Sequence, residues 1–454
     1  DVLAACIAVL GDRAGLLVVD NCEHLLDAVR ETVEAVLSAC PKLSVLATSR
    51  EPVGLAAEYA FRLVPLALPE PDRDPSGAAS VAVFLDRAAR VRPGTPPTPG
   101  DLRLIADIVR GLDGMPLAIE LAAGRLSTFS LRDLHARLDR ALDLLGRAGG
   151  DARHRTLRAT VEWSYQLLGD DERRLFRHLA VFVDGVDLDT AERVAAELGM
   201  AADPGSALSR LVDASMLDVD FAAGATRYRM LETLRAYGLD RLAAAGEDGA
   251  AASRLLRWAV ALTAVFAAGV ATEHEPEVDA ALRRELANLR AGWQLARSRG
   301  AVDEAAGIVA SLMDAVGYRD LVELRGWAEE LAADPALAGH PRAGAVLGIA
   351  AEAAYHRGDH QQATRLAMAG LERATGEDAM YCLLPLSVAA LARGAHAEVV
   401  EHSLAAAALG SDPRDAFGIA ALACAYSGDL DRARALNERG RAAAVSPSMR
   451  SWAA

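Results

Sequence analysis

Lysine is almost absent from this sequence, because only one of its 48 basic residues, Lys42, is a lysine. A phosphate-binding loop of the pattern G-x-x-x-x-G-K-[ST] needs a lysine directly after a glycine. Lys42 follows a proline, so residues 1–454 contain no such loop. The sequence also starts at Asp1 without a methionine and stops at Ala454 soon after a proline. We expect a piece of a longer protein, in which a phosphate loop lies upstream of Asp1 or is degenerate.

Metal-binding and membrane-spanning patterns are missing too. The five cysteines include no C-x-x-C pair, and no histidine lies at metal-ligand spacing, which indicates reduced thiols. The longest uncharged run, residues 258–272, is too short and alanine-rich to span a bilayer, and no signal peptide opens the sequence. The net charge of −15 opposes non-specific binding to nucleic acid. We therefore expect a cytoplasmic protein without membrane contact.

The first 50 residues predict a strand, a helix and a second strand. Residues 16–19 are apolar and end at Asp20, which is typical of a strand buried on both faces. Residues 23–39 have the apolar spacing of a helix on a sheet, and residues 43–49 form a second apolar strand. Strand, crossover helix and strand make a parallel unit. Asp20 and the pair Ser49-Arg50 should therefore share the carboxyl edge of one sheet.

The carboxyl edge of such a sheet is where open α/β proteins bind ligands. The carboxylate of Asp20 could hold Mg²⁺, directly or through water, beside nucleotide phosphates. The guanidinium of Arg50, one strand away, could contact a terminal phosphate with two hydrogen bonds. The alternative is a buried strand that happens to end in aspartate.

Helices dominate after the α/β part, which a proline-rich linker closes near residue 75. Just before this linker, residues 59–63 alternate as a short strand does. Helices are expected at residues 77–91 and 101–112, and Pro116 stands at the first turn of another, where its missing N–H is no loss. The turn at Pro116 could also expose backbone groups to a flat ring; a plain helix start is the alternative.

Five motifs occur in one order, D-N-C-E-H-L-L (20–26), A-T-S-R-E-P (47–52), G-M-P-L-A-I-E-L-A-A (114–123), L-R-A-T-V-E-W-S-Y (157–165) and E-L-A-N-L-R-A (285–291). They resemble the STAND class of signal-transduction NTPases, specifically the bacterial AfsR-type and LuxR-type transcriptional regulators with an NB-ARC-like domain. The resemblance implies that Asp20 is the Walker B aspartate and binds Mg²⁺ through water. It implies that Arg50, with Ser49 beside it, senses the γ-phosphate, and that Pro116 contacts adenine. ATP or ADP, and ATP-dependent assembly of copies, are thereby implied.

Two departures from related switches bear on hydrolysis. Asn21 replaces the water-activating glutamate that usually follows the Walker B aspartate, and Glu23 could substitute only if the helix start bends inward. Leu231 stands where related switches have the histidine of an M-H-D motif, and leucine cannot donate a hydrogen bond to ADP. We assign no catalytic residue and expect slow hydrolysis in the longer protein and none from this chain alone.

The resemblance implies a winged helix after the helical domain, and residues 151–246 fit its pattern of elements. Helices are expected at 156–168, 172–180, 190–198, 206–214 and 231–245, with strands at 216–220 and 226–230 around a turn at Gly224. Residues 151–245 contain 12 arginines and 16 acidic residues, a net charge of −4. This balance favours packing on the nucleotide domain over packing on a duplex, so DNA contact is expected only through a domain outside this chain.

A repeat follows, because Gly358, Gly394 and Gly428 lie at intervals of 36 and 34 residues. Small residues precede each glycine by four positions and apolar residues follow it by five: Ala354, Ala390 and Cys424, then Ala363, Val399 and Ala433. The period is the tetratricopeptide signature, and stacked helix pairs would form a superhelix with a concave surface for a regulatory protein or small molecule. An irregular solenoid without a ligand is the alternative.

These patterns together predict a multidomain, mostly α fold. We expect the C-terminal part of an NB-ARC-like, P-loop-type α/β domain at 1–75, a helical domain at 76–150, a winged helix at 151–246 and tetratricopeptide-like repeats at 247–454. The expected function is the ATP/ADP-dependent switch region of a bacterial transcriptional regulator. The alternative is a non-catalytic binding scaffold with a vestigial NTPase domain, which the missing lysine and Leu231 favour.

Overall fold

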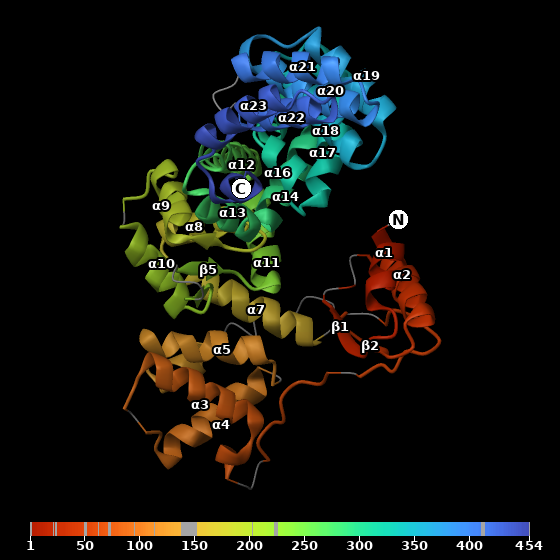
Figure 1. Ribbon diagram of the computed structural model, residues 1–454. Helices are drawn as coiled ribbons and strands as arrows, with labels where there is room; N and C mark the ends of the chain where they lie inside the picture. The colour runs from red at the N-terminus through yellow and green to blue at the C-terminus, as the bar shows by residue number, and fades with distance from the viewer. Residues whose placement is uncertain are drawn as a thin grey trace. The chain divides into compact units, whose positions relative to one another are not determined.

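The computed structural model describes residues 2–20, 22, 25–49, 52–61, 63–70, 74–94, 96–112, 114–137, 152–201, 203–221, 226–409 and 414–453. Helices make up most of these residues, which confirms the predicted mostly α fold (Figure 1). The chain divides into two compact units, Asp1–Leu66 and Ala67–Ala454.

The first unit contains a parallel strand pair with a crossover helix. Its elements, in chain order, are α1 (Val2–Leu10), β1 (Gly15–Val19), α2 (Leu26–Ala39) and β2 (Leu43–Ala47). β1 and β2 pair in parallel, with Gly15 opposite Leu43 and Val19 opposite Ala47. This pairing confirms the predicted strand, helix and strand.

The prediction that β1 is buried on both faces is wrong. Leu17 belongs to one apolar cluster with Leu3 of α1 and Val36 of α2, so both helices cover the same face of the sheet. Side chains alternate along a strand, and Leu16 and Val18, on the other face, are 62% and 58% exposed. An apolar run is buried on both faces only where both faces are covered, and the described helices of the first unit cover one.

The strand predicted at residues 59–63 does not form. Residues 59–61 and 63 belong to no strand, and Tyr59, Phe61 and Leu63 are 89%, 77% and 85% exposed. Alternation alone predicts a strand, but a strand also needs a neighbour that supplies hydrogen bonds. The sheet in the described part of the first unit consists of β1 and β2.

The second unit begins with a helical domain of α3 (Ala79–Val91), α4 (Pro99–Gly111) and α5 (Pro116–Gly124). α4 starts at a capping box, in which Thr98 Oγ1 accepts the N–H of Asp101 at 3.2 Å and Asp101 Oδ2 accepts the N–H of Thr98 at 2.9 Å. α3 packs on both α4 and α5. All three predicted helices are confirmed.

A winged helix follows, with α7 (Ala152–Gln166), α8 (Asp170–Leu179), β3 (Val186–Asp187), α9 (Leu188–Glu197), α10 (Pro204–Asp213), β4 (Asp218–Asp220), β5 (Arg227–Arg229) and α11 (Glu232–Ala244). The sheet order is β3-β5-β4, and both pairs are antiparallel. The hairpin of β4 and β5 is the wing; its predicted turn at Gly224 lies outside the described residues. Phe176, Leu208 and Met216 belong to the core. The predicted order of elements is confirmed.

The remaining helices form an array, coloured green to blue in Figure 1. They are α12 (Asp248–Gly269), α13 (Glu275–Arg284), α14 (Leu286–Arg299), α15 (Val302–Ala310), α16 (Met313–Tyr318), α17 (Val322–Ala332), α18 (Ala343–His356), α19 (His360–Leu371), α20 (Met380–Ala392), α21 (His396–Leu409), α22 (Arg414–Tyr426), α23 (Leu430–Ala443) and α24 (Pro447–Ala453). Among the described helices, α12 alone is long and apolar enough to cross a membrane. Its Leu256, Ala259 and Phe266 are buried in the array's core.

Three helix pairs carry the predicted repeat, namely α18 with α19, α20 with α21, and α22 with α23. The repeated glycines follow the first helix of each pair with φ of +86°, +73° and +86°, a region where glycine is favoured. The residue after each glycine donates its N–H at 2.9–3.0 Å to a carbonyl five residues earlier, that of Ala354, Ala390 or Cys424. The helical repeat is therefore confirmed.

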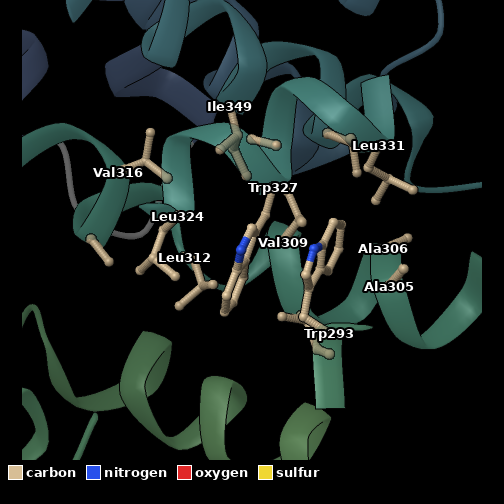
Figure 2. Packing of buried hydrophobic residues seen from close by; sticks show 14 of the residues in the cluster. Trp293, Ala305, Ala306, Val309, Leu312, Val316, Leu324, Trp327, Leu331 and Ile349 are labelled. Atoms are coloured by element: carbon tan, nitrogen blue, oxygen red, sulfur yellow. The ribbon is translucent and has the colours of Figure 1, made fainter. Parts of the chain in front are cut away.

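Two tryptophans form the centre of the array's first half. The rings of Trp293 (α14) and Trp327 (α17) stack with centroids 5.3 Å apart and planes 8° apart (Figure 2). Val309, Val316 and Ile349, from α15, α16 and α18, belong to the same buried cluster. Five successive helices therefore share one core.

Replacing Gly348 with alanine is expected to lower the free energy of unfolding by about 1–3 kcal/mol. A Cβ at Gly348 would lie 2.4 Å from the carbonyl oxygen of Tyr381, so α18 and α20 would have to separate. Gly326 in α17 is the matched control because a Cβ there meets open space; alanine at this site is expected to add up to about 1 kcal/mol. Chemical denaturation measures both variants. Equal stabilities would contradict the close helix contact.

Candidate functional site

The predicted nucleotide-binding edge lies where β1 and β2 end. Asp20 directly follows β1, and Thr48 and Ser49 follow the parallel β2, so the three residues lie at one edge. The N–H of Thr48 donates to Val19 and the N–H of Cys22 donates to Thr48, both at 2.9 Å. The Thr48 hydroxyl donates to the carboxylate of Asp20. Asp20 and Ser49 are exposed at this edge, with the carboxylate oriented by Thr48.

Three residues expected near this edge, Asn21, Glu23 and Arg50, lie outside the described residues. The roles of Asp20, Ser49 and Arg50 therefore stay predictions. Lys42 stands before β2 and pairs with Asp12, which stands before β1, at 4.0 Å. The chain's one lysine thus lies at the opposite edge of the sheet and cannot contact phosphates beside Asp20.

The oxygen atoms beside Asp20 suit Mg²⁺, which prefers carboxylate and water ligands. The Thr48 hydroxyl donates to Oδ1 of this exposed carboxylate and so orients it. The same edge does not suit nucleotide phosphates without further groups, because no lysine reaches it. Residues 1–454 thus contain a carboxylate of the kind that binds Mg²⁺, and they lack a phosphate-loop lysine.

Pro116 is described within the second unit, whereas Asp20 and Ser49 belong to the first. It is the first residue of α5 and is exposed, and Gly114 two residues earlier has φ of +66°. Proline suits this position because the first N–H of a helix has no partner within the helix. Contact with adenine stays a prediction, beside the alternative of a plain helix start.

The winged helix packs on the helical domain through Ser215, which follows α10. Arg87 of α3 donates to Ser215 Oγ from Nη2 at 2.6 Å and from Nε at 3.1 Å. A Cβ on Gly124 of α5 would lie 2.7 Å from this oxygen, so the close approach requires glycine. Ser215 has φ of +56°, where glycine is usual. The serine at this strained position supplies the hydroxyl that Arg87 contacts.

A buried ion pair joins the wing to the array. Arg227 of β5 and Glu285, between α13 and α14, are 5% and 8% exposed, and both guanidinium Nη atoms donate to the carboxylate. Asn288 of α14 donates to Glu285 at 2.8 Å and to the carbonyl of Gly185 at 2.9 Å, and it accepts the N–H of Asp184 at 3.1 Å. Arg227, Glu285 and Asn288 together are called the wing latch below.

The two buried charges of the wing latch, on Arg227 and Glu285, neutralise each other. Burial alone would lower the pKa of Arg227, but the hydrogen bonds and charge of Glu285 outweigh burial, and the pKa is raised. Arg227 Nε also donates to the carbonyl of Asp184 at 2.9 Å. A buried pair with all these partners is costly to break, because removing one member leaves the other charge in the interior.

A second polar junction joins the winged helix to α12. Nη1 of Arg254 lies 2.6 Å from Nδ1 of His178, and because arginine only donates, this nitrogen must accept. His178 is therefore neutral, and its Nε2 lies 3.3 Å from Glu247. Arg177 holds Glu247 at 2.8 and 2.9 Å and donates to the Tyr165 hydroxyl at 2.6 Å. Burial, followed by the charge of Arg254, lowers the pKa of His178 to about 4.

The sequence did not identify these junctions. Glu285 and Asn288 belong to the motif E-L-A-N-L-R-A, which pointed to a family and not to a contact. Two polar residues three positions apart lie on one side of a helix, and here that side is buried. Two polar residues within an apolar helix pattern could have indicated a buried polar contact. The pattern could not name the partner, because Arg227 is 58 residues away in sequence.

Comparison with known proteins finds similarity to a winged helix family and to transcriptional regulators. A family of winged helix-turn-helix domains matches residues 168–243, from the loop before α8 into α11. The chain is 41% identical over 308 residues to a Mycobacterium tuberculosis protein named as a predicted HTH-type transcriptional regulator, and the alignment covers 67% of this chain and 34% of that protein. A Mycobacterium bovis counterpart matches equally well. The chain thus spans about a third of the length of these relatives.

Two further matches have other descriptions. An uncharacterized M. tuberculosis protein is 39% identical over 259 residues, covering 55% of this chain and 62% of that protein. A crystal structure of a Pyrococcus horikoshii STAND protein with a tetratricopeptide repeat sensor covers 96% of this chain and 75% of that one, at 11% identity and a TM-score of 0.32. This score is too low to establish a shared overall fold. The comparisons and the fold together show a winged helix and a helical array in a chain similar to transcriptional regulators.

Proposed function

We propose that this chain is the signal-transduction region of a transcriptional regulator, in which the array senses a partner and the winged helix relays its state. The wing latch is the observation that carries the proposal. Because its ion pair is buried and fully hydrogen-bonded, the wing cannot move relative to α14 without exposing or separating charges. The two states of such a relay would differ in this contact.

The winged helix serves in this proposal as a relay and not as a DNA reader. α10 occupies the position of a recognition helix. Its Arg210 pairs with Glu172 at 2.5 Å, and the residue that follows its C-terminal end, Ser215, is held by Arg87 of the helical domain. Together with the net charge of −4 over residues 151–245, these contacts favour DNA binding by a domain outside residues 1–454.

The proposal also includes a dependence of the relay on the bound nucleotide. ATP with Mg²⁺ and ADP would favour different packings of the winged helix, as in the STAND and NB-ARC switches that the sequence resembles. Asp20 would hold Mg²⁺ through water, and phosphate contacts would include residues outside this chain. Leu231, 45% exposed before α11, offers no donor to ADP. The closed packing would then depend more on contacts such as Arg87 with Ser215.

A nucleotide titration of the full-length protein tests this part. Asp20→Ala is expected to weaken Mg²⁺-dependent ATP binding by about 10-fold or more, because it removes the carboxylate that orients the metal's water. Arg50→Ala is expected to spare ADP and impair the response to ATP. Asp12→Ala, an acid at the opposite edge of the same sheet, is the matched control and should change neither affinity. Residues 1–454 alone should show no ATP turnover.

The alternative is a binding scaffold with a vestigial nucleotide domain. The position of Lys42 and the leucine at 231 are the observations that favour it. Full-length protein that binds a partner through the array, but binds neither nucleotide in the titration above, would establish the scaffold. Equal loss of ATP and ADP binding in Arg50→Ala would contradict a sensor role for that arginine.

A further inference from the structure

Helix α24 of the array is held against α13, near the start of the array. α24 begins at Pro447, and the N–H of Ser448 donates to Glu275 Oε2 of α13 at 2.9 Å, although the two residues are 173 positions apart. The hydroxyls of Ser446 and Ser448 also hydrogen-bond to this carboxylate. Glu275 is 6% exposed and Ser446 is fully buried. We name Glu275, Ser446 and Ser448 the clasp.

The carboxylate of the clasp meets hydrogen-bond donors and a positive charge. The first N–H groups of a helix lack partners and carry the positive end of the helix dipole, so a carboxylate at that place is stabilising. Arg319 donates to the other oxygen of Glu275 at 2.9 Å and to Asp279 at 2.6 Å. Burial alone would raise the pKa of Glu275, but the serine and arginine hydrogen bonds outweigh burial, and the pKa is lowered. The carboxylate is therefore held in its charged form.

A second hydrogen bond also joins an early helix of the array to a late one. The hydroxyl of Tyr318, the last residue of α16, hydrogen-bonds to Asp415 of α22. The chain end in Figure 1 accordingly lies beside α13, and α24 packs on both α13 and α23. The early and late helices of the array thus contact each other directly.

The clasp and the wing latch lie at the two ends of one helix. α13 begins with Glu275, and Glu285 is the residue that immediately follows its last turn. A helix of this length spans about 15 Å and keeps its ends at a fixed separation. Leu282 of α13 is fully buried in the array's core, so the helix has one packed position. Displacing one end of α13 therefore displaces the other.

We propose that α13 is the coupling helix of the relay: the clasp fixes α13 while the array is closed, and opening the clasp moves Glu285 and loosens the wing. This inference rests on the proposed relay function and names its regulation. An effector that separates α24 from α13 is the input, and release of Arg227 from Glu285 is the output. Segment 446–453 acts as an internal restraint on the wing.

Hydrogen exchange of the chain tests the coupling. Glu275→Gln keeps the shape of the side chain but removes its charge, and amide exchange in α24 is expected to rise about 10-fold or more, because hydrogen bonds to a charged group are the stronger kind. Exchange at residues 184–187 and 227–229 should rise with it. Asp279→Asn is the matched control, since Asp279 also lies on α13 and also pairs with Arg319, while its described bonds are to Arg283 and Arg319. It should leave α24 and the wing unchanged.

A second variant leaves α13 intact. Ser446→Ala combined with Ser448→Ala removes both hydroxyl donors from the α24 side, and a smaller rise of a few-fold is expected in α24 and the wing. Faster exchange in α24 with an unchanged wing in both variants would overturn the coupling. So would a uniform rise that includes α5, which contacts neither the clasp nor the latch in the described hydrogen bonds. No nucleotide is needed, so this result and the nucleotide titration fail independently.

Discussion

Arg227→Ala is expected to lower the free energy of unfolding by about 3–5 kcal/mol, the usual cost of removing one member of a buried ion pair. Glu285 would keep its charge at 8% exposure and retain only the amide of Asn288 among the donors of the wing latch. The carbonyl of Asp184 would also lose the Nε donor. The cost therefore comes mostly from the groups left behind and less from the contact itself.

Urea denaturation, followed by circular dichroism, measures this effect. Arg229→Ala is the matched control, because Arg229 lies two residues away on β5, is half exposed and reaches Asp184 and Asp220 only at 3.8 Å. Its removal should cost less than about 1 kcal/mol. A loss below about 1 kcal/mol in Arg227→Ala as well would show that the wing latch is not a buried, fully paired contact, and the relay proposal would lose its main support.

Acid is expected to destabilise the junction of the winged helix with α12 through His178. The pKa of His178 is about 4 in the folded chain and 6.5 in its ordinary state. Between these values the unfolded chain binds the proton more readily, so the stabilising contribution is complete above pH 6.5 and is lost as the pH falls toward 4. At about 1.4 kcal/mol per pH unit, the loss reaches about 2 kcal/mol at pH 5 and about 3 kcal/mol at pH 4.

The physical cause is the set of charges around the imidazole. Burial disfavours the imidazolium most, and the guanidinium of Arg254, 2.6 Å away, adds repulsion that Glu247 only partly offsets. Unfolding free energies of the native chain and of His178→Gln, measured from pH 7 to pH 4, isolate this contribution, because glutamine does not titrate. Parallel stability curves for the two proteins would mean that His178 is not held neutral at this junction.

The proposed relay differs from a DNA-binding role in what the winged helix contacts. Its wing is tied to the array by Arg227, and Ser215, which follows α10, is tied to Arg87 of the helical domain. A module held on two sides by its own chain transmits displacement between those sides.

Local patterns in the sequence predicted most of the elements. The repeated glycines marked the helix pairs because a left-handed backbone position at the end of a helix strongly favours glycine. The strand, helix and strand before residue 50, and the order of elements in the winged helix, followed from apolar spacing within each segment. Ser215 shows the limit of such rules, since a serine takes a left-handed position where glycine is usual.

The sequence by itself determined the elements and their order, because these depend on spacing and backbone preferences over a few residues. Only the tertiary structure decided that one face of β1 stays exposed and that residues 59–61 and 63 form no strand, because both outcomes depend on neighbours that the pattern does not name. It likewise paired Arg227 with Glu285 and Glu275 with Ser448 across 58 and 173 residues. Such pairings follow from how helices pack, and each charged residue alone looks like any other surface charge.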